Sequence, residues 1–248
     1  MFRKYFILLL LAHILGDFYF QTNNMAKKKE TSIKWVIAHS LCYWTIAVVI
    51  LVSLYSMKIF WSGTAIAGIH AVIDIAKYYY LKNSKGKNLK KERLIFFTDQ
   101  AAHIITLTGA AYLLIVYAGE MKINESIEYF FSIIGVPVWS AVYWCSALLL
   151  VHKPANLMIT KLLSVYKPES KDQEKNDKNA GRFIGTLERM IMLIFISINQ
   201  YAAIGLVLTA KSIARYDKIS REKDFAEYYL LGTLISTTIV LAVSFLVW

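Results

Sequence analysis

The stretch IKWVIAHSLCYWTIAVVILVSLY (33–55) decides the fold class of this chain. It carries no acidic residue and a single basic residue, Lys34, near its start. A helix of about 20 apolar residues, rising about 1.5 Å per residue, crosses the roughly 30 Å hydrocarbon core of a bilayer. The stretch therefore predicts a transmembrane helix, and similar apolar stretches recur along the chain.

The composition of the whole chain agrees with a membrane protein. Of its 248 residues, 57% are hydrophobic, whereas about 45–50% is typical of a soluble domain. The candidate membrane segments are 5–22, 33–55, 62–81, 94–118, 129–151, an irregular segment 183–214, and 227–248. We expect an all-α, polytopic transmembrane helix bundle of about six to seven membrane segments, one of them re-entrant. The short first segment is expected to be tilted, partly re-entrant or held among its neighbours.

A charged segment divides the sequence into two membrane modules. YKPESKDQEKNDKNA (166–180) mixes both signs of charge and shows no apolar periodicity, which is typical of a solvated linker. We expect an N-terminal module over 1–165, a cytoplasmic linker over 166–180 and a C-terminal module over 181–248.

The basic residues, which give a net charge of +11, gather in alternate loops. Loops 23–34 and 82–93 and segment 153–182 hold many lysines and arginines, and the intervening loops hold few. Cytoplasmic loops of membrane proteins are enriched in these residues, so we expect the three basic segments to face the cytoplasm of a bacterial inner membrane. Charge that follows topology in this way argues against a nucleic-acid partner.

Segment 211–223 is also basic, so the same rule predicts that it is cytoplasmic. A single membrane crossing through 183–210 would instead place this segment on the external side. We therefore expect 183–214 to enter and return on one side, as half-helices bending near Asn199 and Gln200 or as a surface-lying pair. The alternative is that the charge rule fails at this loop.

Ionisable residues inside the apolar segments form a repeated pattern. Three pairs have i,i+4 spacing, which places the two residues of each pair on one helix face: His13/Asp17, His70/Asp74 and Asp99/His103. These six residues and His39 all lie within roughly 15 Å of the predicted cytoplasmic boundary, if the helix rises about 1.5 Å per residue. A carboxylate at the bilayer centre costs roughly 2.5–3.5 kcal/mol, so such groups face a protein interior or a wet cavity. We call the seven the His/Asp cluster: His13, Asp17, His39, His70, Asp74, Asp99 and His103.

Imidazoles and carboxylates without thiolates suit a divalent metal, zinc first and manganese or iron as alternatives. Cys42 and Cys145 are far apart and form no metal motif. We predict all seven cluster residues as metal ligands, around two ions or around one ion with outer aspartates orienting histidines. Asp17, Asp74 and Asp99 are also the candidate catalytic groups, with Asp99 or Asp74 as a general base.

Plainer roles remain open for each residue of the cluster. An intramembrane histidine can be a hydrogen-bonded packing residue. Asp74 could pair with Lys77 at i,i+3, and Asp99 could favour a helix start through the helix dipole. A shared depth and a repeated spacing favour one common site.

The sequence HILGDFYFQ (13–21), followed by His39, HAVID (70–74) and DQAAH (99–103), resembles an uncharacterised family of bacterial membrane proteins, the domain-of-unknown-function family 3307. The resemblance covers roughly residues 1–118. Such proteins often continue into segments similar to GRFIGTLER (181–189) and QYAAIGLVLTAKSIARY (200–216). The family implies no established activity. More remotely, the H-x-x-x-D pairs are similar to those of inner-membrane metal-dependent hydrolases and all-helical zinc phosphoesterases.

The C-terminal module carries a second ionic feature, Glu188 beside Arg189, which we expect to compensate each other. Lys211 and Arg215 share one helix face and could reach lipid headgroups or bind a phosphate. Gln200, Lys211 and Arg215 are the predicted substrate-binding residues.

The leading hypothesis is a membrane-embedded metal-dependent hydrolase that acts from the cytoplasmic side on a phosphoester or related bond of an amphiphilic substrate. Membrane lipids and a phosphate-bearing amphiphile are the expected partners. One alternative is an ion or metal transporter, although the predicted external halves of the spans hold no Asp, Glu or His. The other is a non-enzymatic scaffold or sensor whose cluster is structural. A P-loop and a G-x-S-x-G elbow are both absent from the sequence.

Overall fold

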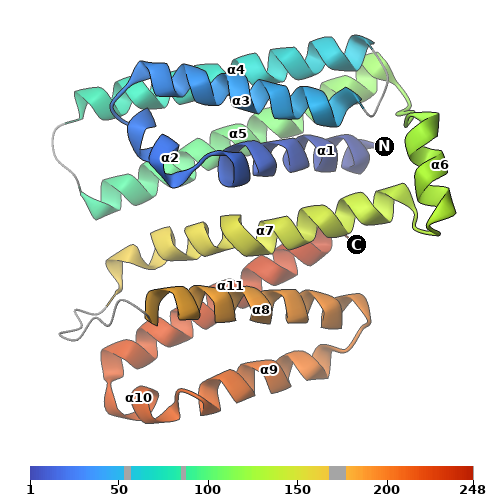
Figure 1. Ribbon diagram of the computed structural model, residues 1–248. Helices are drawn as coiled ribbons and strands as arrows, with labels where there is room; N and C mark the ends of the chain where they lie inside the picture. Colours follow the sequence, from blue (N-terminus) through green and yellow to red (C-terminus); the bar gives the residue numbers. More distant parts are fainter. Residues whose placement is uncertain (53–56, 85–87, 168–176, 248) are drawn as a thin grey trace. The chain divides into compact units, whose positions relative to one another are not determined.

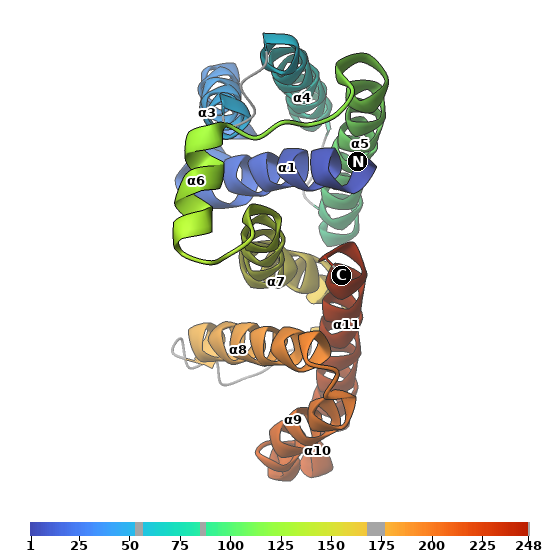
Figure 2. The same ribbon diagram turned by 90° about the vertical axis from the view of Figure 1, so that its right-hand side faces the viewer.

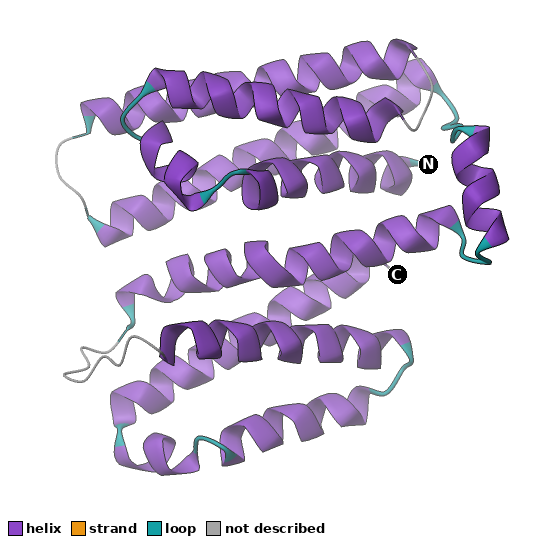
Figure 3. Ribbon diagram, viewed as in Figure 1, coloured by secondary structure: helices purple, strands orange, loops and turns teal. Residues whose placement is uncertain are grey.

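The computed structural model describes residues 1–52, 57–84, 88–167 and 177–247. Every element formed by these residues is a helix (Figure 3). The chain divides into two compact units, Met1–Ser146 and Ala147–Trp248, and each is described by itself. The predicted linker 166–180 falls mainly outside the described residues, so the predicted division there stays a prediction. By its contacts, the segment 147–165 belongs to the C-terminal unit.

The N-terminal unit is built around one buried helix. The helix α1 packs against α3 and α5, while α3 packs against α4 and α4 against α5 (Figures 1 and 2). The elements in chain order are α1 (Phe2–Ile14), the π-helical η1 (Leu15–Phe20), α2 (Asn23–Lys29), α3 (Ile33–Val52), α4 (Met57–Asn83), α5 (Leu89–Ala118), α6 (Glu125–Ile133) and the first part of α7 (Val138–Leu162).

Helix α1 is central because its stretch FILLLLA (6–12) is apolar on every side. Each residue from Ile7 to Ile14 is at most 9% exposed, as expected for a helix without a polar face. The first segment is thus held among its neighbours, one of the three arrangements expected from the sequence. After Phe20 the chain turns by 94° into α2, whose first turn is capped by Thr22 accepting from the Met25 amide.

The all-α polytopic class is confirmed. By length and composition, the described residues form up to six candidate membrane spans if the bent pair Phe2–Phe20 and Asn23–Lys29 counts as one. The other five are Ile33–Leu51, Ile59–Asn83, Leu89–Ala118, Val138–Val165 and Lys223–Leu246.

The predicted span 129–151 has different limits in the structure. Helix α6 ends at Ile133 and α7 begins only at Val138. Between them, Gly135 has a φ of 69°, a left-handed conformation that ends a helix, and Pro137 follows. The long apolar helix is therefore shifted toward the C-terminus.

The C-terminal unit holds the rest of α7, the 3₁₀ turn η2 (Leu163–Val165), α8 (Asp177–Ser197), α9 (Tyr201–Ile213), α10 (Tyr216–Arg221) and α11 (Lys223–Val247). Helix α8 packs against α9 and α11, and α10 packs against α11. The turn between α8 and α9 places Asn199 at a φ of 58°, which asparagine tolerates better than most residues. The bend predicted near Asn199 and Gln200 is present, and Figure 1 shows α9 running back alongside α8.

Candidate metal centre

All seven residues of the His/Asp cluster lie together in the N-terminal unit. They come from five elements of the core: His13 from α1, Asp17 from η1, His39 from α3, the pair His70 and Asp74 from α4, and the pair Asp99 and His103 from α5. None of the seven side chains is more than 9% exposed. The convergence expected from the sequence is therefore present, and the role of these residues as ligands stays a prediction.

The π-helical turn η1 positions Asp17. Here the Gln21 amide donates to the Gly16 carbonyl at 3.2 Å, five residues back instead of the usual four. Such widened turns often occur at functional sites. In this turn the Asp17 carboxylate meets imidazoles of α3 and α4.

Gly16 allows a close approach of α3 to this turn. A Cβ atom at Gly16 would lie 2.5 Å from Cδ2 of Tyr43, so a larger residue would displace the phenol ring. That ring stacks on His70 with centroids 3.7 Å apart. Gly16 and Tyr43 thereby help to fix the orientation of His70.

Asp17, His39 and His70 form the tightest group in the cluster. Oδ1 of Asp17 lies 3.0 Å from Nε2 of His70 and 3.2 Å from Nε2 of His39. One ligand atom from each residue lies within 4.8 Å of the others. A tetrahedral zinc ion with bonds of about 2.0 Å holds its ligand atoms about 3.3 Å apart, so the spacing suits such an ion.

Two further groups share residues with this one. His13, His70 and His103 form an imidazole triad, in which the His70 and His103 rings stack with centroids 4.3 Å apart. Asp74, Asp99 and His103 form a mixed group. His70 and His103 each belong to two groups, so the whole cluster is one connected site.

Several polar atoms of the cluster are buried without a hydrogen bond to any described residue. Most buried polar atoms in folded proteins have such a partner, and a buried orphan costs about 1–3 kcal/mol. Simple packing histidines would not concentrate this cost in one place, whereas metal ligands need free nitrogen lone pairs. The atoms are both ring nitrogens of His13, Nδ1 of His39, Nδ1 of His70, Nε2 of His103 and Oδ1 of Asp99.

Two lysines contact the carboxylates of the cluster. Nζ of Lys29 lies 2.7 Å from Oδ2 of Asp74, and Nζ of Lys77 lies 2.7 Å from Oδ2 of Asp99. The carboxylate of Asp17 is different, because its ion-pair contacts within the described residues are all with imidazoles. With neutral imidazoles, three carboxylates and two ammonium groups leave one negative charge, and it lies at Asp17.

The comparison with known families covers this whole site. The family model described as "Protein of unknown function (DUF3307)" matches residues 5–133, more than half of the chain. The chain belongs to the DUF3307 family. The matched segment contains the entire His/Asp cluster together with Lys29 and Lys77. No curated protein and no solved structure matches the chain.

The lysine contacts of this DUF3307 protein were missed by sequence reasoning. An i,i+3 pair between Asp74 and Lys77 had seemed possible, yet Lys77 reaches across to Asp99 on α5. Asp74 instead receives Lys29, which the sequence offered only as a topology-setting charge. Local spacing gives no signal for either contact, because both join residues far apart in the chain.

The predicted substrate-binding residues Gln200, Lys211 and Arg215 all lie in the C-terminal unit, beyond the DUF3307 segment. Gln200 is exposed and precedes α9, and Arg215 is half-buried and precedes α10. Nζ of Lys211 lies 2.7 Å from Oε2 of Glu188. A role of the three residues toward a substrate stays a prediction.

The expected charge compensation between Glu188 and Arg189 is present as a favourable electrostatic interaction. Each side chain also has separate hydrogen-bond partners, because adjacent residues do not face each other on a helix. Glu188 binds Lys211, while the Arg189 guanidinium is buried among neutral acceptors. Its Nε donates to the Val151 carbonyl at 2.7 Å, and an Nη donates to Oδ1 of Asn156 at 2.7 Å.

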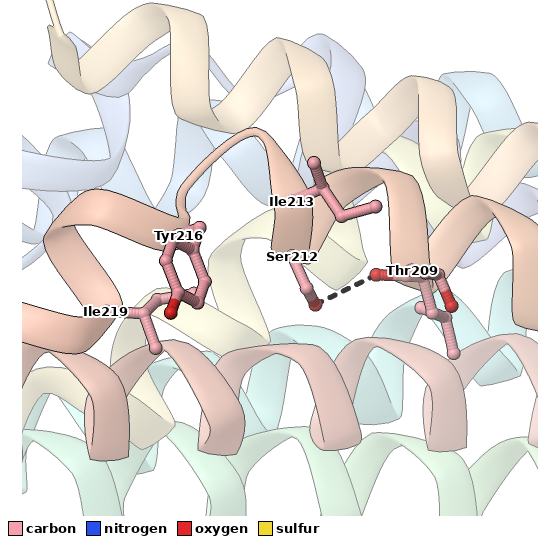
Figure 4. Close-up of a pocket in the computed structure, with 6 residues that line it drawn as sticks. Thr209, Ser212, Ile213, Tyr216 and Ile219 are labelled. Carbon is pink, nitrogen blue, oxygen red and sulfur yellow. Dashed lines mark hydrogen bonds between the residues drawn. The ribbon is translucent and has the colours of Figure 1, made fainter.

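A cavity of about 360 Å³ opens beside α9 and α10 in the C-terminal unit (Figure 4). In it, the Ser212 hydroxyl donates to the Leu208 carbonyl at 2.9 Å. Its lining is apolar apart from three hydroxyl groups, so it lacks groups for acid–base or metal chemistry. It is lined by Leu208, Thr209, Ser212, Ile213, Tyr216 and Ile219.

Proposed function

We propose that this membrane protein is a metal-dependent hydrolase with its metal centre at Asp17, His39 and His70. The supporting observation is the buried carboxylate of Asp17, which has no ammonium partner among the described residues and faces Nε2 of both His39 and His70. A divalent cation at this position would take up the remaining negative charge and be held by Asp17, His39 and His70. Zinc suits these ligands best, and manganese or iron are alternatives.

The remaining cluster residues suit the handling of protons and the completion of the ligand set. When bound, a divalent ion acts as a Lewis acid and makes water acidic enough to attack a phosphoester near neutral pH. Asp99 and Asp74 are the candidate bases, and Nε2 of His103 lies 3.7 Å from Oδ1 of Asp99, close enough for a water to relay a proton. His13 has no hydrogen bond at either ring nitrogen and could offer one of them, either to the same ion or to a second one.

The substrate we propose is an amphiphile with a phosphoester or related bond, reached from the cytoplasmic side. The cluster lies among helices long and apolar enough to cross a membrane, which suits a lipid-like molecule. The basic loops next to the cluster-bearing ends of these helices support a cytoplasmic opening in a bacterial inner membrane.

The test begins with metal analysis of the purified full-length protein. We expect at least one equivalent of zinc, manganese or iron per chain, lost in His39→Ala and His70→Ala. His152→Ala is the matched control, because it removes the one histidine outside the cluster. Hydrolysis of bis(p-nitrophenyl) phosphate and of a phospholipid panel should fall together with metal content.

Two outcomes would overturn the proposal. A folded wild-type protein without stoichiometric metal would leave the cluster structural. A metal-loaded protein that takes up the ion into proteoliposomes, while cleaving nothing in the panel, would favour the transporter instead.

A further inference from the structure

Lys29 and Lys77 reach the same corner of the His/Asp cluster from different helices. Lys29 lies in the last turn of α2, after the sharp bend that follows η1, and Lys77 lies one turn beyond Asp74 on α4. Their carboxylate partners Asp74 and Asp99 offer oxygens within 4.8 Å of each other and of a His103 nitrogen. Each ammonium group therefore contacts a carboxylate of this one group of candidate ligands.

Both ammonium groups keep donor capacity and some access to solvent. An ammonium has three N–H donors. Lys29 uses two of them, on Asp74 and on Oε1 of Gln21 at 2.9 Å, and Lys77 uses one on Asp99. Their side chains are 12% and 30% exposed, against at most 9% within the cluster, so they mark its more open side.

The charge of the site selects the class of substrate. Three carboxylates, two ammonium groups and one divalent ion leave a single positive charge inside a low-dielectric environment. A phosphodiester monoanion neutralises that charge, whereas a neutral carboxylic ester leaves it uncompensated, which is costly away from water. Lysine is also a common point-charge ligand for phosphate oxygens.

We propose that Lys29 and Lys77 form a phosphate-binding subsite beside the metal centre, which takes the monoanionic phosphodiester group of the substrate. This inference rests on the proposed hydrolase function for its charge argument. The subsite itself is made of residues outside the metal ligands, and its affinity for phosphate can be measured separately.

The experiment uses the full-length protein in detergent micelles and inorganic phosphate as the first probe. Binding is followed by calorimetry in Lys29→Met and Lys77→Met, with and without added zinc. The matched controls are Lys28→Met and Lys82→Met, exposed lysines on the same two helices. We expect at least a tenfold loss of phosphate affinity in the first pair, unchanged affinity in the controls, and wild-type metal content throughout.

A second readout separates substrate classes. KM for bis(p-nitrophenyl) phosphate should rise at least tenfold in the two methionine variants, and by a larger factor than KM for the neutral p-nitrophenyl acetate. Phosphatidylglycerol in the micelle should compete with inorganic phosphate if the natural group is a lipid headgroup, and should leave its binding unchanged if the natural ligand is free phosphate. Lys29→Arg and Lys77→Arg keep the charge and should restore binding if a methionine variant fails to fold.

Wild-type phosphate affinity in metal-loaded methionine variants would overturn the subsite and leave the hydrolase proposal standing. Absence of metal from the wild-type protein would instead overturn the proposed function. In that event, phosphate binding to the metal-free protein that depends on Lys29 and Lys77 would still support the subsite. If the metal-free protein binds no phosphate, the subsite is overturned as well.

Discussion

At the scale of single residues, the three carboxylates of the cluster are not equivalent. Asp74 and Asp99 each hold a lysine at 2.7 Å, so each is neutralised by the protein itself. Asp17 contacts imidazoles and is held by a π-helical turn that directs it into the cluster. A metal ion is therefore expected to depend most strongly on Asp17.

Asp17→Asn should weaken metal binding by at least the roughly 10–100-fold that is typical for losing an outer partner of a metal ligand, because it removes the negative charge and keeps the shape of the side chain. The amide oxygen of Asn can still accept from His39 and His70, so the fold should survive. Metal content after dialysis and zinc titration by calorimetry measure the effect, with Asp217→Asn on α10 as a control. Equal zinc affinity in Asp17→Asn and wild type would remove Asp17 from the ligand set.

Gly16→Ala should destabilise the N-terminal unit by about 1–3 kcal/mol, the usual cost of overpacking a core. Its Cβ would lie 2.5 Å from the Tyr43 ring, which cannot move without disturbing the stacked His70. The matched control is Gly109→Ala on α5, where a Cβ would meet nothing within 4 Å. This substitution should stabilise the helix by about 0.5–1 kcal/mol, because alanine is less flexible than glycine in the unfolded chain. Thermal melts of the two variants should shift in opposite directions, and equal shifts would contradict the packing argument.

At the scale of helices, the apolar runs predicted most of the long helices, because a helix of membrane-spanning length can be recognised from its apolar composition alone. The limits of α6 and α7 were missed because an apolar window gives no weight to Gly135 and Pro137. The depth and spacing of the cluster residues were readable from 3.6-residue periodicity. The π turn at Asp17 was not, because a widened turn has no simple sequence pattern.

Helix α7 makes a contact with α8 that joins residues far apart in the sequence. Pro154 lies inside α7 and has no N–H, so the helix loses a backbone hydrogen bond at this turn. Arg189 of α8 donates to the nearby Val151 carbonyl and to the Asn156 side chain. The guanidinium thus joins α7 to α8 where the helix ladder is weakest.

Arg189→Met should lower the stability of the C-terminal unit by about 1–3 kcal/mol, because it leaves the Asn156 side chain and the Val151 carbonyl with fewer donors. Asn156→Ala should give a smaller loss, since the guanidinium keeps its bonds to Val151 and Ser236. Arg182→Met, at an exposed position on the same helix, is the control. Urea titration in mild detergent provides the comparison, and an unchanged midpoint in Arg189→Met would show that this contact does not hold the helices together.

At the scale of the whole molecule, the metal should stabilise the fold. The proposed ligands Asp17, His39 and His70 come from η1, α3 and α4, so an ion bound there links three elements of the N-terminal unit. An ion present at about 100 times its dissociation constant adds about 2.7 kcal/mol of stability. A strong chelator should therefore lower the melting temperature of wild type, and zinc should restore it. Asp17→Asn should respond weakly to both, and a chelator effect of equal size in wild type and Asp17→Asn would place the ion elsewhere.

Topology is the remaining property of the whole chain, and the basic loops predict it. Single cysteines at Glu30, Lys122 and Ser220, all exposed positions, can be introduced after Cys42 and Cys145 are replaced by alanine. The positive-inside rule places Glu30 in the cytoplasm and Lys122 outside, because 23–34 is basic and the segment around Lys122 is acidic. The basic segment 153–182 is predicted to be cytoplasmic as well, and α9 runs back alongside α8, so we expect Ser220 on the cytoplasmic side. A membrane-impermeant maleimide should label only the Lys122 position in intact spheroplasts, and all three after lysis. Labelling of the Ser220 position in intact spheroplasts would mean that the segment from α8 to α9 crosses the membrane. Labelling of the Glu30 position would place the more open side of the His/Asp cluster on the external face of the membrane.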